Sequence, residues 1–399
     1  MATAQILKFY LELVIIWWFL IYASDTWSAY RTIKKCSWKN WEKWPAHSTP
    51  HRSLVYADPQ LVDDYSYPER PQLINYFTKK LSDHYLHRNY MIVNELLRPD
   101  SIFFLGDLFD GGREHDGDDV WFKEYKRFNR IFPKFPNVRI NMALPGNHDI
   151  GFGNEVDLDK LMRFRTFFGD VNTFDLLGNH SFILVDSISL SSQSQPLVTN
   201  DPRWFLENLT DSLAMQYPRI LFTHVPLFRD PDQQTCGPLR EHNKQLFPIQ
   251  KGYQYQTVID PDLSKFILAK SKPSLVLSGD DHDYCHIQHE FTDLGTKGTV
   301  GEDYCDEITV KACSMTGGIS KPAIQLLSLY NNLDINSRLS SNTIQQQMCL
   351  LPSPFGAVKF LAFAYAATLL LALRKFKTER IYFHAFAIST IIILLIFNH

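Results

Sequence analysis

The feature of this sequence that most constrains its fold is a set of five short apolar runs, each leading directly into Asp, Asn, Gln or His. The runs are SLVYA (53–57), SIFFL (101–105), VRINMAL (138–144), RILFT (219–223) and SLVLS (274–278). Segments with a helical pattern, such as 84–97 and 119–131, lie between them, and this alternation predicts an α/β fold. Ligands gather beyond the carboxyl ends of the strands in such sheets, so we expect the five strand ends to converge.

The last run ends in the densest group of charges, Asp280, Asp281, His282 and Asp283. Carboxylates this close together repel one another unless a cation lies among them. A metal ion would supply that cation, whereas a solvated acidic turn needs none, and this stretch alone leaves both interpretations open. Side chains two residues apart can face the same side of an extended chain. We therefore expect Asp280 and His282 to face the site, with Asp281 and Asp283 directed to structural partners.

The order of these polar groups resembles the calcineurin-like metallophosphoesterase superfamily. The motifs are DPQ at 58–60, GDLFDGGR at 106–113, PGNHD at 145–149, the single His224 and SGDDHDYC at 278–285. The resemblance implies a four-layer α-β-β-α sandwich that binds two divalent metal ions. Together with the apolar termini, the motifs look like the narrower Cdc1-type group. Those enzymes of the secretory pathway remove ethanolamine phosphate from mannoses of the glycosylphosphatidylinositol (GPI) anchor.

The resemblance implies roles for individual positions. The first metal would take Asp58, Gln60, Asp107 and His282, and the second Asp107, Asn147, His224 and Asp280, with Asp107 bridging. His148 would protonate the leaving group, and Asp149 would fix its orientation. Asp110 is expected to support or cap this region rather than bind metal. Arg113 is expected either to contact phosphate or to anchor its loop.

Two predicted ligands depart from the superfamily pattern. Gln60 and Asp280 stand where histidines are usual. Oxygen donors make a site harder than imidazoles do, so we predict Mn²⁺ rather than Zn²⁺. No CxxC spacing occurs among the six cysteines, so the sequence does not indicate a cysteine-based zinc site.

Apolar segments at both ends predict an integral membrane protein. Residues 5–23 predict an N-terminal anchor, with a cleaved signal peptide as the alternative. Residues 354–373 and 381–398 predict two transmembrane helices, with a buried helical hairpin as the alternative. The positive-inside rule assigns the basic loop RKFKTER between them to the cytosol, and this orientation places a domain at 50–325 in the lumen.

Other features bear on this organisation. Basic residues at 31–43 would then be lumenal, which disagrees with the rule. Residues 326–350 contain a stretch rich in Ser and Asn and are expected to be a linker. A lumenal domain could pair some of its cysteines, and Asn179-His-Ser and Asn208-Leu-Thr are glycosylation sequons.

Three functions remain open from the sequence. The net charge of −3 gives no basic field for nucleic acid, so we expect no such partner. The resemblance implies a phosphodiesterase of the endoplasmic reticulum or early Golgi lumen. It would act on GPI-anchored proteins or the GPI glycolipid and support their maturation and ER-to-Golgi transport. The alternatives are a phosphatase for another lumenal phosphoester and a phosphoglycan-binding cargo adaptor. The presence of both Asp107 and His148 favours an enzyme over an adaptor.

Long insertions carry further polar and aromatic residues. His115, His242 and the aromatic-rich segment 247–256 could line a glycan site, or could simply belong to the core or surface. The sequence alone does not separate these interpretations.

Overall fold

The computed structural model describes residues 3–242, 247–291, 304–331, 343–375 and 381–397. The chain divides into two compact units. One comprises Met1–Lys35 with Pro352–His399, and the other comprises Cys36–Leu351. The second unit contains both sheets and all of the predicted site residues.

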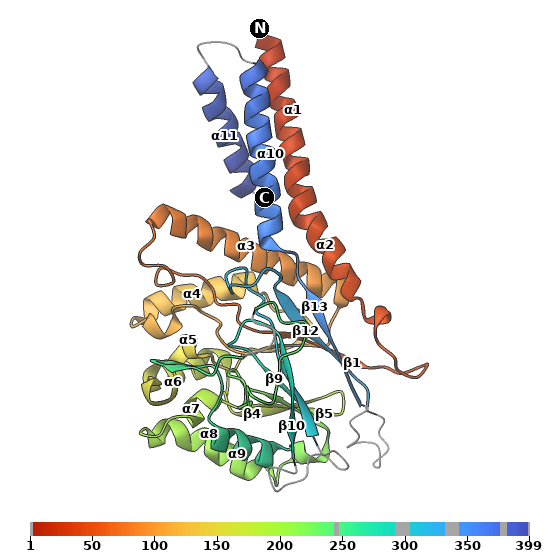
Figure 1. The fold of residues 1–399 in the computed structure, drawn as a ribbon, viewed down its shortest axis with the longest axis vertical. Helices are drawn as coiled ribbons and strands as arrows, with labels where there is room; N and C mark the ends of the chain where they lie inside the picture. The colour runs from red at the N-terminus through yellow and green to blue at the C-terminus, as the bar shows by residue number, and fades with distance from the viewer. Residues whose placement is uncertain (1–2, 243–246, 292–303, 332–342, 376–380, 398–399) are drawn as a thin grey trace. The chain divides into compact units, whose positions relative to one another are not determined.

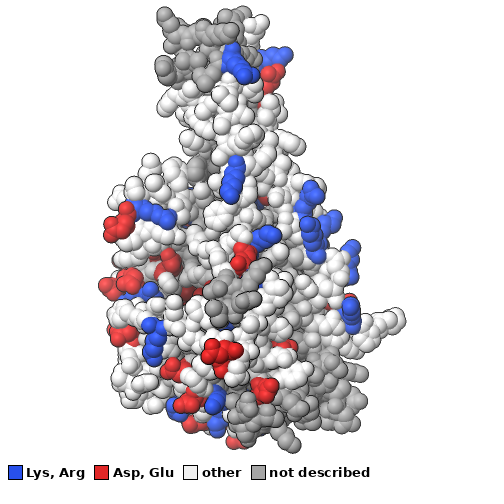
Figure 2. All heavy atoms as spheres, in the orientation of Figure 1, with Lys and Arg blue, Asp and Glu red and all other residues white. Residues whose placement is uncertain are grey.

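The first unit is helical. Its elements are α1 (Thr3–Tyr22), the π-helical turn η1 (Ala23–Trp27), α2 (Ser28–Ile33), α10 (Pro354–Lys375) and α11 (Ile381–Phe397). Two helical runs, Ala4–Cys36 and Pro354–Ala372, are long and apolar enough to cross a membrane. The third expected span is α11, whose apolar part His384–Ile393 is shorter. Figure 2 shows few charged side chains along these helices on the face in view.

The basic loop that orients the expected spans lies mostly outside the described residues, which omit 376–380. Membrane crossing and orientation therefore stay predictions for this unit.

The second unit is built on two mixed β-sheets. The first has the order β13 (Ile344–Leu350), β12 (Ala323–Leu329), β1 (His51–Tyr56), β2 (Ser101–Phe104), β3 (Arg139–Asn141). The second has the order β10 (Cys285–Glu290), β11 (Tyr304–Thr309), β9 (Leu275–Ser278), β6 (Arg219–Phe222), β5 (His180–Leu184), β4 (Thr173–Leu177). All five apolar runs predicted as strands are confirmed, as β1, β2, β3, β6 and β9.

Strand direction explains why the polar groups collect. Strands β1, β2 and β3 are parallel neighbours, and so are β6 and β9 in the other sheet. Parallel neighbours finish at the same edge of a sheet, and ligands bind beyond that edge. Each sheet therefore presents its own group of Asp, Asn, Gln or His side chains at one edge.

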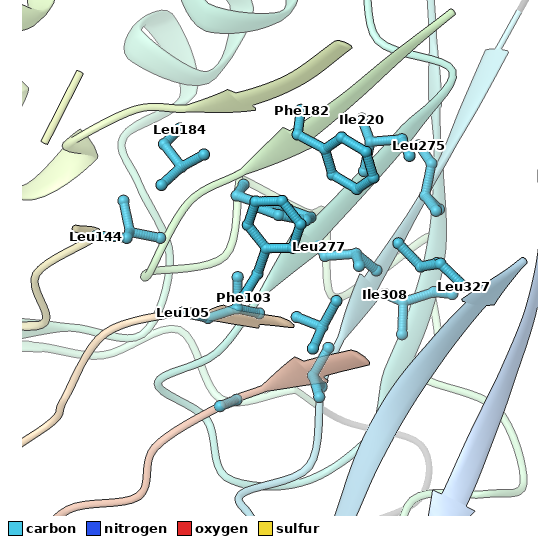
Figure 3. Close-up of a cluster of buried hydrophobic side chains, with 14 of the residues drawn as sticks. Phe103, Leu105, Leu144, Phe182, Leu184, Ile220, Leu275, Leu277, Ile308 and Leu327 are labelled. Atoms are coloured by element: carbon cyan, nitrogen blue, oxygen red, sulfur yellow. The ribbon is translucent and has the colours of Figure 1, made fainter. Parts of the chain in front are cut away.

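The core lies between the two sheets (Figure 3). Phe103 of β2 places its ring centroid 4.6 Å from that of Phe182 and 4.9 Å from that of Phe222, both in the second sheet. All three side chains are fully buried, and burial of each contributes about 2 kcal/mol. Strands covered on both faces read as continuous apolar runs, which is why β1, β2, β6 and β9 could be found from the sequence, whereas β3 is a partly exposed edge strand.

Helices cover the outer faces of the sheets (Figure 1). On one side lie α3 (Gln72–Leu97) and α4 (Asp118–Ile131), and on the other lie α8 (Pro196–Leu209) and α9 (Pro261–Ser271). Shorter elements complete the unit, namely α5 (Asn147–Ile150), α6 (Leu158–Phe168), α7 (Ser187–Leu190), β7 (Lys251–Gly252) and β8 (Tyr255–Gln256).

The expected linker at 326–350 is wrong. Strand β12 pairs with β1, and β13 pairs antiparallel with β12 along its whole length, so both belong to the first sheet. The Ser- and Asn-rich part of this segment overlaps residues 332–342, which lie outside the described residues. Strand β13 is an edge strand whose glutamines are partly exposed, and this polarity conceals it in the sequence.

Four of the six cysteines form two disulfides. Cys36 pairs with Cys349, and Cys236 pairs with Cys285. Cys305 and Cys313 are both buried. The first disulfide joins the two ends of the domain, whereas the second ties the segment after β6 to the start of β10.

Candidate metal centre

The predicted ligands converge on two overlapping groups. Ligand atoms of Asp58, Asp107 and His282 lie within 4.8 Å of one another, and so do those of Asp107, His224 and Asp280. Asp107 belongs to both groups, as a residue bridging two metal ions must. The other two predicted ligands touch the same residues, since Gln60 Nε2 lies 3.0 Å from Asp107 Oδ2 and Asn147 Oδ1 lies 3.3 Å from His224 Nε2.

Left-handed backbone conformations are concentrated at the predicted ligands. Eleven non-glycine residues in the described part of the chain have positive φ, and five of them are Asp58, Gln60, Asp107, Asp280 and His282. Such conformations cost on the order of 1–3 kcal/mol each and cluster at functional sites. Here they turn the chain sharply just after β1, β2 and β9, which brings the side chains back over the strand ends.

Two glycines allow the strand ends to approach closely. A Cβ on Gly106, where φ is +95°, would lie 2.6 Å from His224 Nδ1. A Cβ on Gly146 would lie 2.0 Å from Asp107 Oδ1. The glycines of the GD and GN motifs are therefore required by the packing of the centre itself.

His224 is held in the tautomer that a metal ligand needs. Its Nδ1–H donates to the Leu105 carbonyl at 2.6 Å, so Nε2 faces the centre. Nε2 lies 3.3 Å from Asp107 Oδ1 and 3.6 Å from Asp280 Oδ1. Burial lowers the pKa of His224, but these two carboxylates raise it by a larger amount, so the pKa lies well above its usual range. A bound cation would take the place of that proton.

Asp58 offers an independent test of whether the residues fit a metal. Its side chain is fully buried, and Oδ1 accepts a bond from the Asp280 backbone N–H at 3.1 Å. Oδ2 has no hydrogen-bond partner among the residues that the structure describes. Burial raises the pKa of Asp58 to about 6, and a buried carboxylate oxygen without a partner is costly unless it coordinates an ion. Asp58, Asp107 and His282 therefore fit one divalent cation, and Asp107, His224 and Asp280 a second.

His148 lies at the rim of the centre, with its side chain about one-quarter exposed, at 27%. Its Nδ1 is 2.6 Å from the Asp110 carbonyl and 3.5 Å from the Asp110 carboxylate. Its backbone N–H donates to Asp107 Oδ1 at 2.9 Å. The imidazole is thus oriented by Asp110, which leaves Nε2 for a substrate.

The expectation that Asp149 orients His148 is wrong. The Asp149 carboxylate instead accepts backbone N–H bonds from Leu108, Phe109 and Gly146, at 3.1, 3.0 and 2.8 Å. Both residues lie in the single turn α5, where consecutive side chains point about 100° apart. Asp149 therefore ties the GD and GN loops together, while Asp110 contacts the imidazole.

Arg113 and His115 anchor the loop that follows Asp110. Arg113 Nη1 donates to the Asn147 carbonyl at 3.2 Å, which is the loop-anchoring alternative. His115 is almost fully buried, and its Nε2 lies 3.0 Å from Asp63 Oδ2. A buried histidine cannot line a glycan surface, so that interpretation of His115 is wrong. Sequence reasoning missed Asp63, which also accepts the Gly111 N–H at 3.0 Å.

The acidic loop after β9 divides as expected. His282 belongs to the first ligand group and Asp280 to the second, whereas Asp281 and Asp283 belong to neither. Asp281 accepts two bonds from Arg240, one of them at 3.0 Å from Nη2. Asp283 accepts backbone N–H bonds from Glu241 and His242, both at 2.8 Å, and lies 3.3 Å from Lys311 Nζ. Sequence reasoning missed Arg240, because nothing local marks it as the partner of Asp281.

These features define a metal-dependent phosphoester hydrolase. A family model described as calcineurin-like phosphoesterase matches residues 51–284, and the chain belongs to this family. The family uses divalent metal ions, and both groups that share Asp107 lie within the matched residues.

Relatives support the same assignment. The chain is 51% identical to cell division control protein 1 of Saccharomyces cerevisiae over 88% of this chain and 71% of that protein. It is 30% identical to metallophosphoesterase 1 of Danio rerio over 65% of this chain and 70% of that protein. A structure of phosphopantetheinyl hydrolase from Mycobacterium tuberculosis aligns with a TM-score of 0.34 and 12% identity, covering 66% and 91% of the two chains. That last likeness is too low to carry an argument.

Proposed function

We propose that this protein is a membrane-anchored phosphodiesterase of the secretory-pathway lumen. It removes ethanolamine phosphate from a mannose of the GPI glycan and so supports maturation and ER-to-Golgi transport of GPI-anchored proteins. The observation that carries the chemistry is the pair of ligand groups that share Asp107, with His148 beside them. The substrate rests on the resemblance to the Cdc1-type group.

The division of labour follows from the contacts. When bound, two divalent ions supply Lewis acidity, which neutralises charge on the phosphoryl group and makes water a better nucleophile. His148, oriented through Nδ1 by Asp110, gives a proton from Nε2 to the departing sugar oxygen. Asp149 and Gly146 hold the loop that carries His148 against Asp107.

Two observations support a lumenal domain. Disulfides persist in oxidising compartments, and two pairs of cysteines are bonded. Asn208 and Thr210 of one sequon are exposed at the end of α8, where a glycan can be attached. Asn179 of the other sequon is only partly exposed, so we expect glycosylation at Asn208 rather than Asn179.

We propose Mn²⁺ as the metal. The three carboxylates Asp58, Asp107 and Asp280 outnumber the two imidazoles of His224 and His282 in the two groups. Such a donor set favours a harder ion than a histidine-rich site does. Metal analysis that found two zinc ions, with no activity dependent on manganese, would overturn this choice.

The experiment that tests the function is release of phosphoethanolamine from a GPI glycan by the detergent-purified full chain. We expect release with Mn²⁺, none with a chelator, and a loss of about 10²-fold or more in His148→Asn. His47→Asn is the matched control, since His47 is exposed and asparagine tolerates its positive φ.

The other functions correspond to defined outcomes. Hydrolysis of small phosphodiesters without release from the glycan would point to another lumenal phosphoester. Glycan binding without hydrolysis of any phosphoester, in metal-loaded protein, would point to an adaptor.

A further inference from the structure

A short β-hairpin outside the two sheets reaches the candidate metal centre. Its strands are β7 and β8, where Lys251 pairs with Gln256 and Gly252 with Tyr255. The turn between them consists of Tyr253 and Gln254. A Cβ on Gly252 would lie 2.1 Å from the Tyr255 ring, so the ring packs directly on the glycine and stiffens the hairpin.

The tip of this hairpin bonds a predicted ligand. The Gln254 carbonyl accepts a hydrogen bond from Asn147 Nδ2 at 3.1 Å. An asparagine binds a cation through its oxygen, so its nitrogen must point elsewhere. This bond holds Nδ2 away from the centre and leaves Asn147 Oδ1 on the side of His224 Nε2. The hairpin is therefore fixed at the rim where substrate must arrive.

The root of the hairpin is fixed as well. Phe247, just before it, is buried with Arg229 and Arg240 lying over its ring, at 4.5 and 5.2 Å from the centroid. After the hairpin, the Ile259 N–H donates to the Pro226 carbonyl at 2.8 Å. A turn held at both ends presents its side chains in a defined position.

Tyr253 is the side chain that this turn presents. It is 78% exposed, the most exposed of the large aromatic residues in the described part of the chain. A single exposed tyrosine is ordinary on a protein surface. Tyr253 is different because it directly precedes Gln254, whose carbonyl is bonded to Asn147, and consecutive Cα atoms are only about 3.8 Å apart.

We propose that Tyr253 is a sugar-binding subsite for the ring that carries the phosphate ester. One face of a hexose is lined by C–H groups, and a rigid phenol ring offers a flat apolar surface with a hydrogen-bonding hydroxyl at its edge. When the phosphate of the substrate is bound at the metal centre, the sugar lies only one ester bond away from that phosphate. The subsite rests on the proposed function and names the residue that recognises the sugar rather than the phosphate.

The test compares two ethanolamine phosphodiesters, one of a mannoside and one of methanol, on Mn²⁺-loaded full chain. We expect Tyr253→Ala to lower kcat/KM for the mannoside about tenfold, from loss of one apolar contact, and to change that for the methyl diester less than about twofold. Tyr253→Phe should keep the mannoside rate. Tyr304→Ala is the control, since Tyr304 is also exposed, at 52%, but begins β11, at the opposite end of the strand from the metal centre.

The remaining outcomes overturn the subsite. An equal loss on both substrates would mean that the residue only supports Asn147, and no loss on either would mean that the sugar does not touch it. A wild-type chain that cleaves the methyl diester but not the mannoside would instead contradict the proposed function. Calorimetric binding of mannose 6-phosphate then decides the subsite separately, because Tyr253→Ala must still weaken it about tenfold.

Discussion

The two sheets supply the two halves of the candidate centre, and each half is held in place differently. The first sheet contributes Asp58, Gln60, Asp107 and Asn147. These are tied by short-range bonds among the strand ends, such as the Gln60 N–H to the Asp107 carbonyl at 2.8 Å. The second sheet contributes His224, Asp280 and His282. The loop that carries the last two is tied to a surface insertion, through Cys236–Cys285, Arg240–Asp281 and the bonds to Asp283.

This difference separates two kinds of dependence. The supports of the first half are the strand ends themselves, so altering them also disturbs the packing of the sheets. The second half depends on contacts of residues 236–242, which lie outside both sheets. Substitutions in residues 236–242 should therefore release Asp280 and His282 from their fixed positions while the sheets stay folded.

The largest effect is expected where the halves meet. Asp107→Ala removes the carboxylate shared by both ligand groups, so both ions should be lost and kcat/KM should fall by about 10⁴-fold or more. Metal content by mass spectrometry and hydrolysis of a small phosphodiester would be measured together. Asp116→Ala is the matched control, because that carboxylate is 92% exposed, and two bound ions in Asp107→Ala would contradict the bridging role.

The next effect contrasts the two disulfides. Replacing Cys236 and Cys285 by serine opens a loop whose ends are 49 residues apart, which should cost about 4 kcal/mol of unfolding free energy. It should also weaken metal binding about 10- to 100-fold, since it releases supports of the Asp280 loop. Replacing Cys36 and Cys349 should destabilise the domain with metal affinity unchanged. Calorimetric titration with Mn²⁺ after each replacement checks this, and equal affinities would abolish the distinction between the halves.

Acid sensitivity should come from the scaffold. Burial lowers the pKa of His180 from 6.5 to about 4. Between these two pKa values the unfolded chain therefore binds more protons than the folded chain. The contribution of His180 to stability is complete above pH 6.5 and is lost as the pH falls through 4, by about 3 kcal/mol. Denaturant unfolding of metal-free protein across this range should show a shallower pH dependence in His180→Gln than in the wild type. Parallel curves would assign the sensitivity to other groups.

The smallest effect concerns one ion pair of the insertion. Arg240→Met leaves Asp281 largely buried without its partner, which should cost about 2 kcal/mol. Arg139→Met, which breaks an exposed pair with Asp175, should cost less than about 1 kcal/mol. Chemical denaturation measures both. Adding Asp281→Leu to Arg240→Met should restore part of the loss, and a further loss instead would show that the charge itself is not the problem.

The sequence predicted the strands and the positions of the ligands because both signals are local. A strand buried on both faces reads as an apolar run, and a turn residue directly after it is fixed relative to that strand. The alternation of Asp280 and His282 with Asp281 and Asp283 was also predictable from chain geometry alone. Edge strand β13 was missed because its half-exposed face carries glutamines.

The supports of the centre could not be predicted in the same way. Arg240 pairs with a residue 41 positions away across an insertion, and Gln254 acts through a backbone carbonyl that any residue possesses. The assignment of Asp149 failed because the turn α5 separates neighbouring side chains, which the motif NHD does not reveal. Non-local contacts and main-chain groups leave no mark in a single sequence.

The disulfide between Cys36 and Cys349 also has a mechanical consequence. Its cysteines are 313 residues apart, and they lie next to the segments that leave the domain for the apolar helices. A pull applied through those segments would be carried by one covalent bond, and the polypeptide between the two cysteines would bear none of the load. The catalytic domain is thus closed into a covalent ring at the point where both connecting segments leave it. A force that pulls these two segments apart would therefore not unfold the polypeptide inside the ring.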